Sequence, residues 1–204
     1  MKGLGGAKKI LDMEIHRDRQ AQKLILSQKN YIKRVLQRFN MDNSKPMSIP
    51  LASHFRLSPD RCPQSEIERK QMSHISYSSA VDSLMYAMVC TGRDLSHAVS
   101  VVSRYMSNPG KEHWQAVKRV FRYLKGTTHI GLVFDNNKVS HNNIIGYVDS
   151  DYVGDLDKQR SLSGYIFTLC NSAINWKASL QSIVALSTTE AEYISLIEGV
   201  KEAI

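Results

Sequence analysis

The sequence predicts an α+β fold with an N-terminal hairpin, a middle block of helices, and a smaller C-terminal unit of three antiparallel strands and one helix. Apolar and polar residues alternate near the N-terminus, apolar residues recur at helical spacing in the middle, and short strand-like runs follow residue 143. The chain has 204 residues, of which 42% are hydrophobic, and this is enough to bury a core.

The N-terminal region is predicted to form a hairpin, one helix and a linker. The hairpin strands are expected at residues 9–15 and 23–26, with a charged turn at 16–22. Ser27 can cap the next helix, whose apolar stripe consists of Tyr31, Ile32, Val35, Leu36 and Phe39. Prolines break regular structure between residues 43 and 66, so this segment is the first predicted linker.

The middle region is predicted to contain three helices. The first two are indicated by apolar residues at helical spacing: Ala80, Leu84, Met85 and Met88, then Leu95, Ala98, Val99, Val102, Tyr105 and Met106. Asp94 is the expected cap of the second helix. The third helix starts at Asn108 with Pro109 in its first turn, and Gly126 follows its last turn. Its buried stripe is expected to be Trp114, Val117, Phe121 and Leu124.

The C-terminal region has the sequence pattern of several short strands. A strand is expected at residues 131–134, and the polar run 135–143 is the second predicted linker. Three further strands are predicted at 144–149, 164–169 and 173–176, the last two joined by a tight turn at 170–172. The capping-box pattern at residues 187–190 predicts a helix that begins at Thr188.

Asp149 and Glu192 are candidate metal ligands. If Asp149 ends a strand and Glu192 lies early in the next helix, both carboxylates can converge at one end of a small sheet, although 43 positions separate them. Such hard oxygen ligands suit magnesium, and two magnesium ions can promote phosphodiester cleavage. The alternative is an Asp that caps a turn and a Glu on a solvated helix face. Other polar residues near Asp149 indicate a charged loop: Asp155, Asp157, Lys158 and Arg160.

Basic residues indicate a polyanionic partner. The net charge is +8 and the isoelectric point is near 9.4. Away from the apolar stripes, two of the predicted helices carry the candidate nucleic-acid-binding residues Lys33, Arg34, Arg38, Lys118, Arg119, Arg122 and Lys125. A groove that faces phosphates and a merely solvated basic surface both fit this pattern.

Several functional classes find no support in the sequence. Cys62, Cys90 and Cys170 are odd in number and form no Cys-x-x-Cys pair, which favours a reducing intracellular setting. No apolar run approaches the ~20 residues of a membrane span, and the N-terminus lacks the apolar core of a signal peptide. We therefore expect a protein of the cytoplasm or nucleus with no membrane partner. No nucleophile elbow or phosphate-binding loop occurs.

Segments along almost the whole chain together resemble the Pol polyprotein of copia-type LTR retrotransposons. They follow the expected order and lie at residues 1–15, 26–41, 77–88, 103–109, 124–127, 149–151, 161–165, 176–177 and 185–193. They include Ser-Arg-Tyr-Met-Ser-Asn-Pro at 103–109, Leu-Lys-Gly-Thr at 124–127, and Leu-Ser-Thr-Thr-Glu-Ala-Glu-Tyr at 186–193. Asp12 and Asp82 depart from the family pattern, which usually has Gly there, so disturbed packing or strand geometry is expected at both positions.

The resemblance implies three regions. Residues 1–60 would be the end of a reverse transcriptase palm, with a primer-grip hairpin at 10–15, and the start of the thumb. Residues 61–135 would be the helical thumb and connection. Residues 136–204 would be the N-terminal half of a ribonuclease H-like domain, an incomplete α/β unit of three antiparallel strands and a helix.

The resemblance also implies roles for the candidate ligands. Asp149 and Glu192 match the first two catalytic carboxylates, which bind Mg²⁺, of ribonuclease H. The family's two later aspartates are expected beyond Ile204, and its polymerase aspartates before the first residue. The site is therefore expected to be incomplete.

Three hypotheses about function result. The leading one is a fragment of a reverse transcriptase and ribonuclease H polyprotein, inactive by itself, which binds RNA–DNA hybrid or duplex and the rest of the Pol polyprotein. The second is residual magnesium-dependent ribonuclease H activity. The third is a basic interaction module without enzymatic activity, or a functionless remnant. An uncovered sheet edge and helix face are expected in the C-terminal region, with poor solubility as the result.

Overall fold

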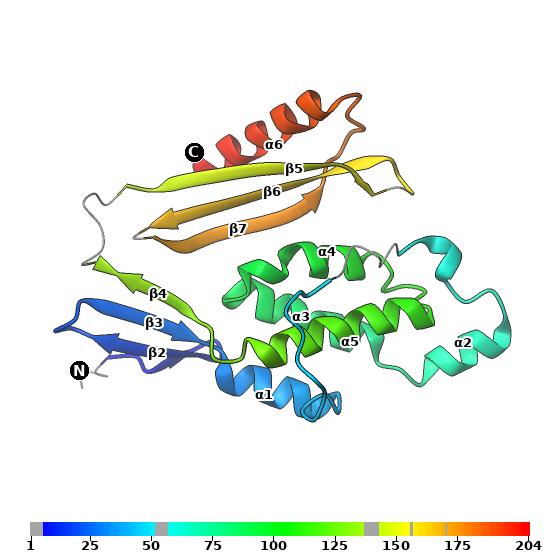
Figure 1. Cartoon of the computed structure of the whole chain (residues 1–204), viewed down its shortest axis with the longest axis horizontal. Helices are drawn as coiled ribbons and strands as arrows, with labels where there is room; N and C mark the ends of the chain where they lie inside the picture. Colours follow the sequence, from blue (N-terminus) through cyan, green and yellow to red (C-terminus); the bar gives the residue numbers. More distant parts are fainter. Residues whose placement is uncertain (1–5, 52–56, 137–142, 156, 170) are drawn as a thin grey trace, which may run out of the picture.

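The computed structural model describes residues 6–51, 57–136, 143–155, 157–169 and 171–204 of the chain. Its arrangement is α+β: a block of helices adjoins a four-stranded sheet and a three-stranded sheet, and the last helix covers one face of the three-stranded sheet (Figure 1). Among the described helices, none combines the length and apolar composition that a membrane crossing requires.

The first sheet joins the N-terminal hairpin to a strand that follows the helical block. Its strands pair antiparallel in chain order: β1 (Lys9–Ile10), β2 (Met13–Asp18), β3 (Lys23–Ser27) and β4 (Leu132–Asp135). Leu26 of β3 lies opposite Leu132 of β4. The strand predicted at 131–134 is confirmed, and the helical block is inserted between two neighbouring strands of one sheet.

A tight turn divides the strand that was expected at residues 9–15, so the prediction of a single strand is wrong. Leu11 and Asp12 have φ values of 44° and 56°, and two successive left-handed residues form a hairpin turn rather than a strand. The Asp12 carboxylate lies 2.8 Å from Lys9 Nζ and 2.9 Å from Arg34 Nη2. Hydrogen bonds from these two cations lower the pKa of Asp12. A side chain at position 12 is thus accommodated by the turn.

The helical block contains the main core. Its described α-helices are α1 (Lys29–Arg38), α2 (Glu66–Ser73), α3 (Tyr77–Cys90), α4 (Ser96–Ser103) and α5 (Lys111–Gly126), with 3-10 turns η1 (Pro59–Arg61) and η2 (Arg93–Leu95). Side chains from α1, α3, α4 and α5 meet in one cluster, in which Leu84, Val102 and Phe121 are fully buried. The apolar stripes predicted for α1 and α5 face this cluster, which confirms both helices.

Two features of the block differ from the sequence prediction. Apolar periodicity misses α2, because Met72 is its only buried residue, although Ser65 and Glu68 form a capping box at its start. Asp94 is not a helix cap, because η2 leads directly into α4. Its carboxylate instead accepts a hydrogen bond from the Tyr123 hydroxyl.

Gly110 determines where α5 begins. A Cβ at this position would lie 1.9 Å from the carbonyl oxygen of Arg61, so the close approach requires glycine. The N–H of Gly110 donates to Nδ1 of His113 at 2.8 Å. The helix therefore begins after Gly110 rather than at Pro109, and Gly126 is its last residue instead of following it.

The C-terminal unit has the three strands and the helix that the sequence predicts. β5 (Ile145–Asp155), β6 (Arg160–Leu169) and β7 (Ser172–Leu180) pair antiparallel in that order, and α6 (Thr188–Ala203) follows. The strands are longer than expected, and the helix start at Thr188 is confirmed. Ser187 Oγ accepts the N–H of Glu190 at 3.1 Å. Parts of the predicted linker at 135–143 and turn at 170–172 lie outside the described residues, and Asp135 belongs to β4.

The two faces of the second sheet contact different elements. α6 packs on one face through small buried residues, Ala191, Ser195 and Gly199. The other face is turned toward α4 and the end of α3, where Trp176 Nε1 donates to the carbonyl oxygen of Met88 at 3.1 Å (Figure 1). The sheet is thus covered by helices of two different regions of the chain.

Candidate functional site

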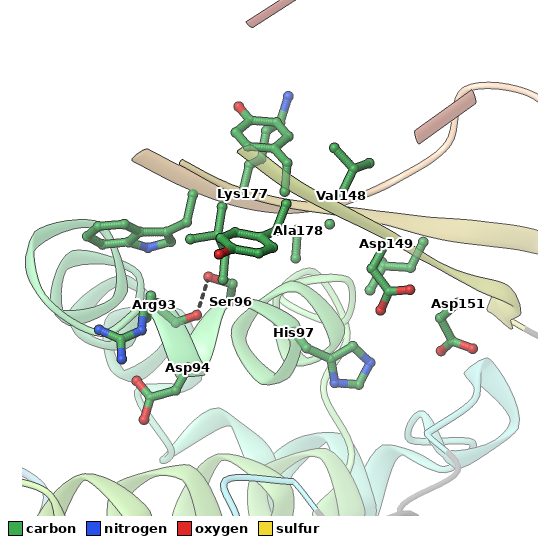
Figure 2. A pocket seen from close by; sticks show the side chains of 15 residues that line it. Arg93, Asp94, Ser96, His97, Val148, Asp149, Asp151, Lys177 and Ala178 are labelled. Carbon is green, nitrogen blue, oxygen red and sulfur yellow. Dashed lines mark hydrogen bonds between the residues drawn. The ribbon is translucent and has the colours of Figure 1, made fainter. Parts of the chain in front are cut away.

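Asp149 lies in the middle of β5, on the face of the second sheet that is turned toward α4. The preceding residue, Val148, faces α6, since a Cβ on Gly199 would lie 2.7 Å from its side chain. Because successive side chains of a strand alternate between faces, Asp149 and Asp151 point away from α6. Figure 2 shows both carboxylates on the side of His97, which belongs to α4.

Glu192 lies in the second turn of α6, on the other side of β5. It is exposed and lines a hollow of about 610 Å³ together with Val148, Thr188 and Tyr193. Asp149 lines a different hollow. The structure therefore does not bring Asp149 and Glu192 to one site. The reason is the register of β5, because convergence would require the side chain of Asp149 to face α6.

The described residues do not form a preassembled cluster of metal ligands. Among them, no group of three or more His, Cys, Asp and Glu side chains is placed to hold a metal. Magnesium in proteins usually keeps several waters and is bound by one or two carboxylates. The catalytic roles of Asp149 and Glu192 stay predictions, and no step through magnesium follows from their positions.

A hollow of about 370 Å³ lies between α4 and the second sheet. Asp149, Asp151 and His97 contribute polar groups to it, and Tyr147 and Trp176 belong to its apolar lining. Loss of hydration lowers the pKa of His97, while the Asp151 carboxylate opposes this shift. Sequence reasoning missed His97 because no local motif marks it and β5 lies far from α4 in the chain.

The basic residues of α1 are exposed, and two of them also make intramolecular contacts. Arg34 Nη2 lies 2.9 Å from the Asp12 carboxylate, and Arg38 Nη2 donates to Ser79 Oγ at 2.8 Å. Lys33, which precedes Arg34, is also exposed. α1 therefore presents three predicted cations at the surface.

Two predicted cations of α5 hold the linker that follows α1. Arg122 Nε donates to the carbonyl oxygen of Lys45 at 2.7 Å, and Lys125 Nζ donates to that of Ser44 at 2.6 Å. The remaining two, Lys118 and Arg119, are half-buried. The positive face of α5 is thus less hydrated than its sequence indicates, because part of it packs against the protein itself.

Charge is divided unequally along the chain. Residues 1–142 contain 23 Lys and Arg against 11 Asp and Glu, a net charge of +12, whereas residues 143–204 contain 4 against 8, a net charge of −4. A phosphate backbone is attracted by the first part and repelled by the second. The basic residues of α1 and the residue Asp149 therefore lie in parts of the chain with opposite net charge.

Comparison with known proteins gives several relatives. No family model matches the chain, and no solved structure does. The Retrovirus-related Pol polyprotein from transposon TNT 1-94 of Nicotiana tabacum is 55% identical over 204 residues, 100% of this chain and 15% of the polyprotein. The corresponding polyprotein from transposon RE2 of Arabidopsis thaliana is 37% identical over 182 residues, 89% of this chain and 12% of the polyprotein.

A third relative is much shorter. Secreted RxLR effector protein 161 of Plasmopara viticola is 44% identical over 133 residues, which are 65% of this chain and 92% of that protein. In contrast, the chain spans less than a sixth of the length of each of the two polyproteins.

Proposed function

We propose that the chain, which is similar to retrovirus-related Pol polyproteins from transposons, is a nucleic-acid-binding part of such a polyprotein. The chain would comprise the end of a reverse transcriptase palm, the thumb and connection, and the first half of a ribonuclease H-like domain. The succession of a hairpin, helices, three strands and a helix supports this proposal.

The proposed ligand is RNA–DNA hybrid or duplex, bound by the N-terminal part of the chain. The observation that carries this proposal is the net charge of +12 on residues 1–142. Lys33, Arg34 and Arg38 lie exposed on α1 and are the first candidates for phosphate contacts. The parent activities would be RNA-directed DNA synthesis and hydrolysis of RNA in RNA–DNA hybrids.

Binding of a fluorescent RNA–DNA hybrid over a range of salt concentrations tests this proposal. Affinity should fall as salt rises, because each phosphate contact releases counterions. Lys33→Gln should weaken binding and reduce the logarithmic salt slope by about one. Lys201→Gln is the matched control, because Lys201 is an exposed cation on the acidic part of the chain. Affinity that does not depend on salt, or an equal effect of both variants, would contradict the proposal.

We also propose that the chain by itself has little or no ribonuclease H activity. This view is supported by the different hollows that Asp149 and Glu192 line, the first facing α4 and the second beside α6. The test is hydrolysis of a hybrid substrate with Mg²⁺. Cleavage that Asp149→Asn abolishes would favour residual ribonuclease H activity instead.

A further inference from the structure

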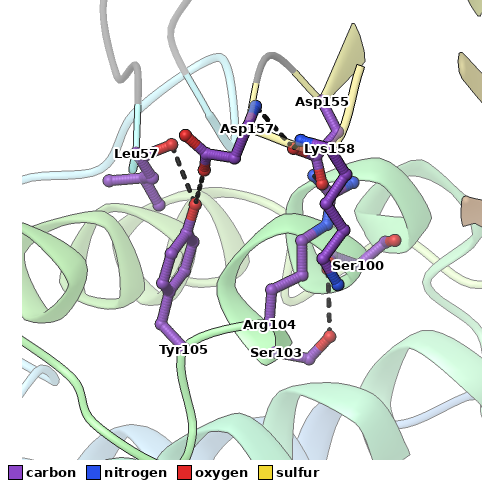
Figure 3. Close-up of polar contacts among 8 residues, drawn as sticks. All are labelled: Leu57, Ser100, Ser103, Arg104, Tyr105, Asp155, Asp157 and Lys158. Atoms are coloured by element: carbon purple, nitrogen blue, oxygen red, sulfur yellow. Dashed lines mark hydrogen bonds and ion pairs between the residues drawn. The ribbon is translucent and has the colours of Figure 1, made fainter. Parts of the chain in front are cut away.

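Two carboxylates connect parts of the chain that are far apart in sequence, and the first of them is buried. At the end of α4, Arg104 Nη1 lies 3.0 Å from Asp155 Oδ2, and these side chains are only 17% and 5% exposed (Figure 3). The expectation that Asp155 belongs to a solvated charged loop is therefore wrong, because Asp155 is buried at the end of β5. Removal of either partner would leave a mostly buried charge without its counterion. Arg104 thus serves the fold and is not available to a ligand.

The second connecting carboxylate, Asp12, is exposed. Its Oδ1 lies 2.8 Å from Lys9 Nζ and 2.9 Å from Arg34 Nη2. The side chains of Asp12, Lys9 and Arg34 are 38%, 52% and 54% exposed, so a large ligand can reach all three. Exposed ion pairs are weak, because each charge is well hydrated without its partner. A phosphate group can therefore compete with the Asp12 carboxylate for both cations.

Two tyrosines hold the β1–β2 turn close to α1. The Tyr86 hydroxyl of α3 donates to the carbonyl oxygen of Leu11, and the ring centroids of Tyr86 and Tyr31 are 4.9 Å apart. The Arg34 guanidinium carbon lies 6.0 Å from the centroid of the Tyr31 ring, within range of the attraction between a cation and an aromatic face. The turn and Arg34 therefore have contacts that keep them side by side without the charge of Asp12.

Arg38 extends this group of cations along α1. It follows Arg34 by four residues, so the two side chains share one face of the helix. Arg38 is exposed, and its Nη2 donates to Ser79 Oγ at 2.8 Å. Lys9, Arg34 and Arg38 thus form a row of cations that runs from the β1–β2 turn along α1. In the described part of the chain, every ion pair of this row involves Asp12.

We propose that Lys9, Arg34 and Arg38 form one surface that contacts the phosphates of nucleic acid, and that Asp12 is an internal counterion that weakens this binding. A phosphate that takes the place of the Asp12 carboxylate still has that carboxylate beside it, because the turn is short and held in place. The two negative charges repel each other at this distance. The inference rests on the proposed function, to which it adds Lys9 as a contact and Asp12 as a competitor.

Binding of the fluorescent RNA–DNA hybrid over a range of salt concentrations tests the role of Asp12. Asp12→Asn removes the charge but keeps the size of the side chain, and asparagine accepts the φ value of 56° at this position. This variant should bind the hybrid about five- to tenfold more tightly at about 0.1 M salt, with a logarithmic salt slope steeper by about one. Lys9→Gln in the Asp12→Asn chain should remove most of the gain. Circular dichroism shows whether each variant is folded, and Asp12→Gly, which removes the same charge, decides the outcome if Asp12→Asn unfolds.

Asp60→Asn is the matched control, because Asp60 is an exposed acid of the same basic part of the chain and has no ion pair among the described residues. It should bind the hybrid nearly as the parent does. Lys70→Gln, which changes an exposed cation of α2, is the control for Lys9→Gln in the Asp12→Asn chain.

Equal gains from Asp12→Asn and Asp60→Asn, or equal losses from the two lysine variants, would overturn the inference, because overall charge would then explain the result. If Lys33→Gln weakens binding but Asp12→Asn does not tighten it, the proposed function stands and this inference fails. Affinity of the parent that does not depend on salt would contradict both.

Discussion

His113 is a buried imidazole whose neutral form stabilises the start of α5. Its Nδ1 accepts the N–H of Gly110 at 2.8 Å, and its ring stacks on Tyr105 with 4.0 Å between the centroids. Loss of hydration lowers the pKa of His113, and the Ser58 backbone and Glu112 oppose this shift less strongly. A proton on Nδ1 would replace the acceptor with a second donor opposite Gly110, so protonation disfavours the folded state.

The free energy of unfolding should therefore fall as the pH drops below about 6.5, the ordinary pKa of histidine. The unfolded chain binds this proton more tightly than the folded chain. The stabilisation is complete above that pH and is lost as the pH falls through the lower pKa of the folded state. Urea unfolding at about pH 7.5 and about pH 5.5 measures the difference, which His113→Gln should reduce.

His97 should add only a small part of this pH dependence, because its side chain is exposed, although partial desolvation lowers its pKa as well. The control is His129→Gln, which changes an exposed histidine and should leave the pH dependence of the parent unchanged. An identical loss of stability in the parent and in His113→Gln would show that His113 is not responsible.

The hairpin turn shows why some features at the scale of single residues could not be predicted. Apolar alternation at residues 9–15 is compatible with one strand, and Leu11 and Asp12 are not residues that demand left-handed backbone. Their positive φ values result from the pairing of β1 with β2 and from the ion pairs of Asp12. Neither cause is visible in the local sequence.

At the scale of elements, the cap of α6 gives a direct prediction. Ser187 Oγ accepts the N–H of Glu190 at 3.1 Å, and a Glu190 carboxylate oxygen accepts the N–H of Leu186 at 2.7 Å. Ser187→Ala should lower the free energy of unfolding by about 1 kcal/mol, because a helix N–H loses its acceptor. Thermal or urea unfolding measures the change. Thr189→Ala, in the same helical turn, should have a clearly smaller effect.

The helices that sequence predicts well are those that bury a regular apolar stripe. Val35 and Leu36 of α1 and Val117 and Phe121 of α5 are buried as the periodicity indicates. α2 was missed because it buries only Met72, so its evidence lies in its cap rather than in a stripe. The pairing of β4 with β3 could not be predicted, because local patterns do not specify long-range partners.

For the whole molecule, the outer surface of α6 predicts self-association. Tyr193, Leu196, Ile197 and Val200 are 49–63% exposed on this helix, and β5 beside it pairs with only one strand among the described residues. An exposed apolar surface next to an unpaired strand edge promotes aggregation. Leu196→Lys combined with Ile197→Lys should lower light scattering at high protein concentration without loss of the circular dichroism spectrum.

The control for self-association is Ile67→Lys, which changes an apolar residue of α2 that is 72% exposed. It adds positive charge away from α6. If it reduces light scattering as much as the double variant, the added charge rather than the α6 surface accounts for the effect.

The candidate site was predictable only in part. Sequence placed Asp149 at the end of a strand and Glu192 early in a helix. The structure confirms the position of Glu192, but Asp149 lies in the middle of β5 rather than at its end. Whether the two side chains meet depends on which face of β5 is covered by α6. A shift of one residue in the register of β5 would reverse the answer. The contributions of His97 and Arg104 depend on the docking of α4 against the sheet, which no local pattern describes.

The insertion of the helical block between β3 and β4 also has a consequence for synthesis on the ribosome. β3 is made early, but its neighbour in the sheet, β4, starts only at Leu132. Elongation adds about 5–20 residues per second, so the nascent hairpin exposes an open edge for several seconds while α1 to α5 are made. The helices can associate in this interval, and the emergence of β4 then closes the sheet around residues that are already packed.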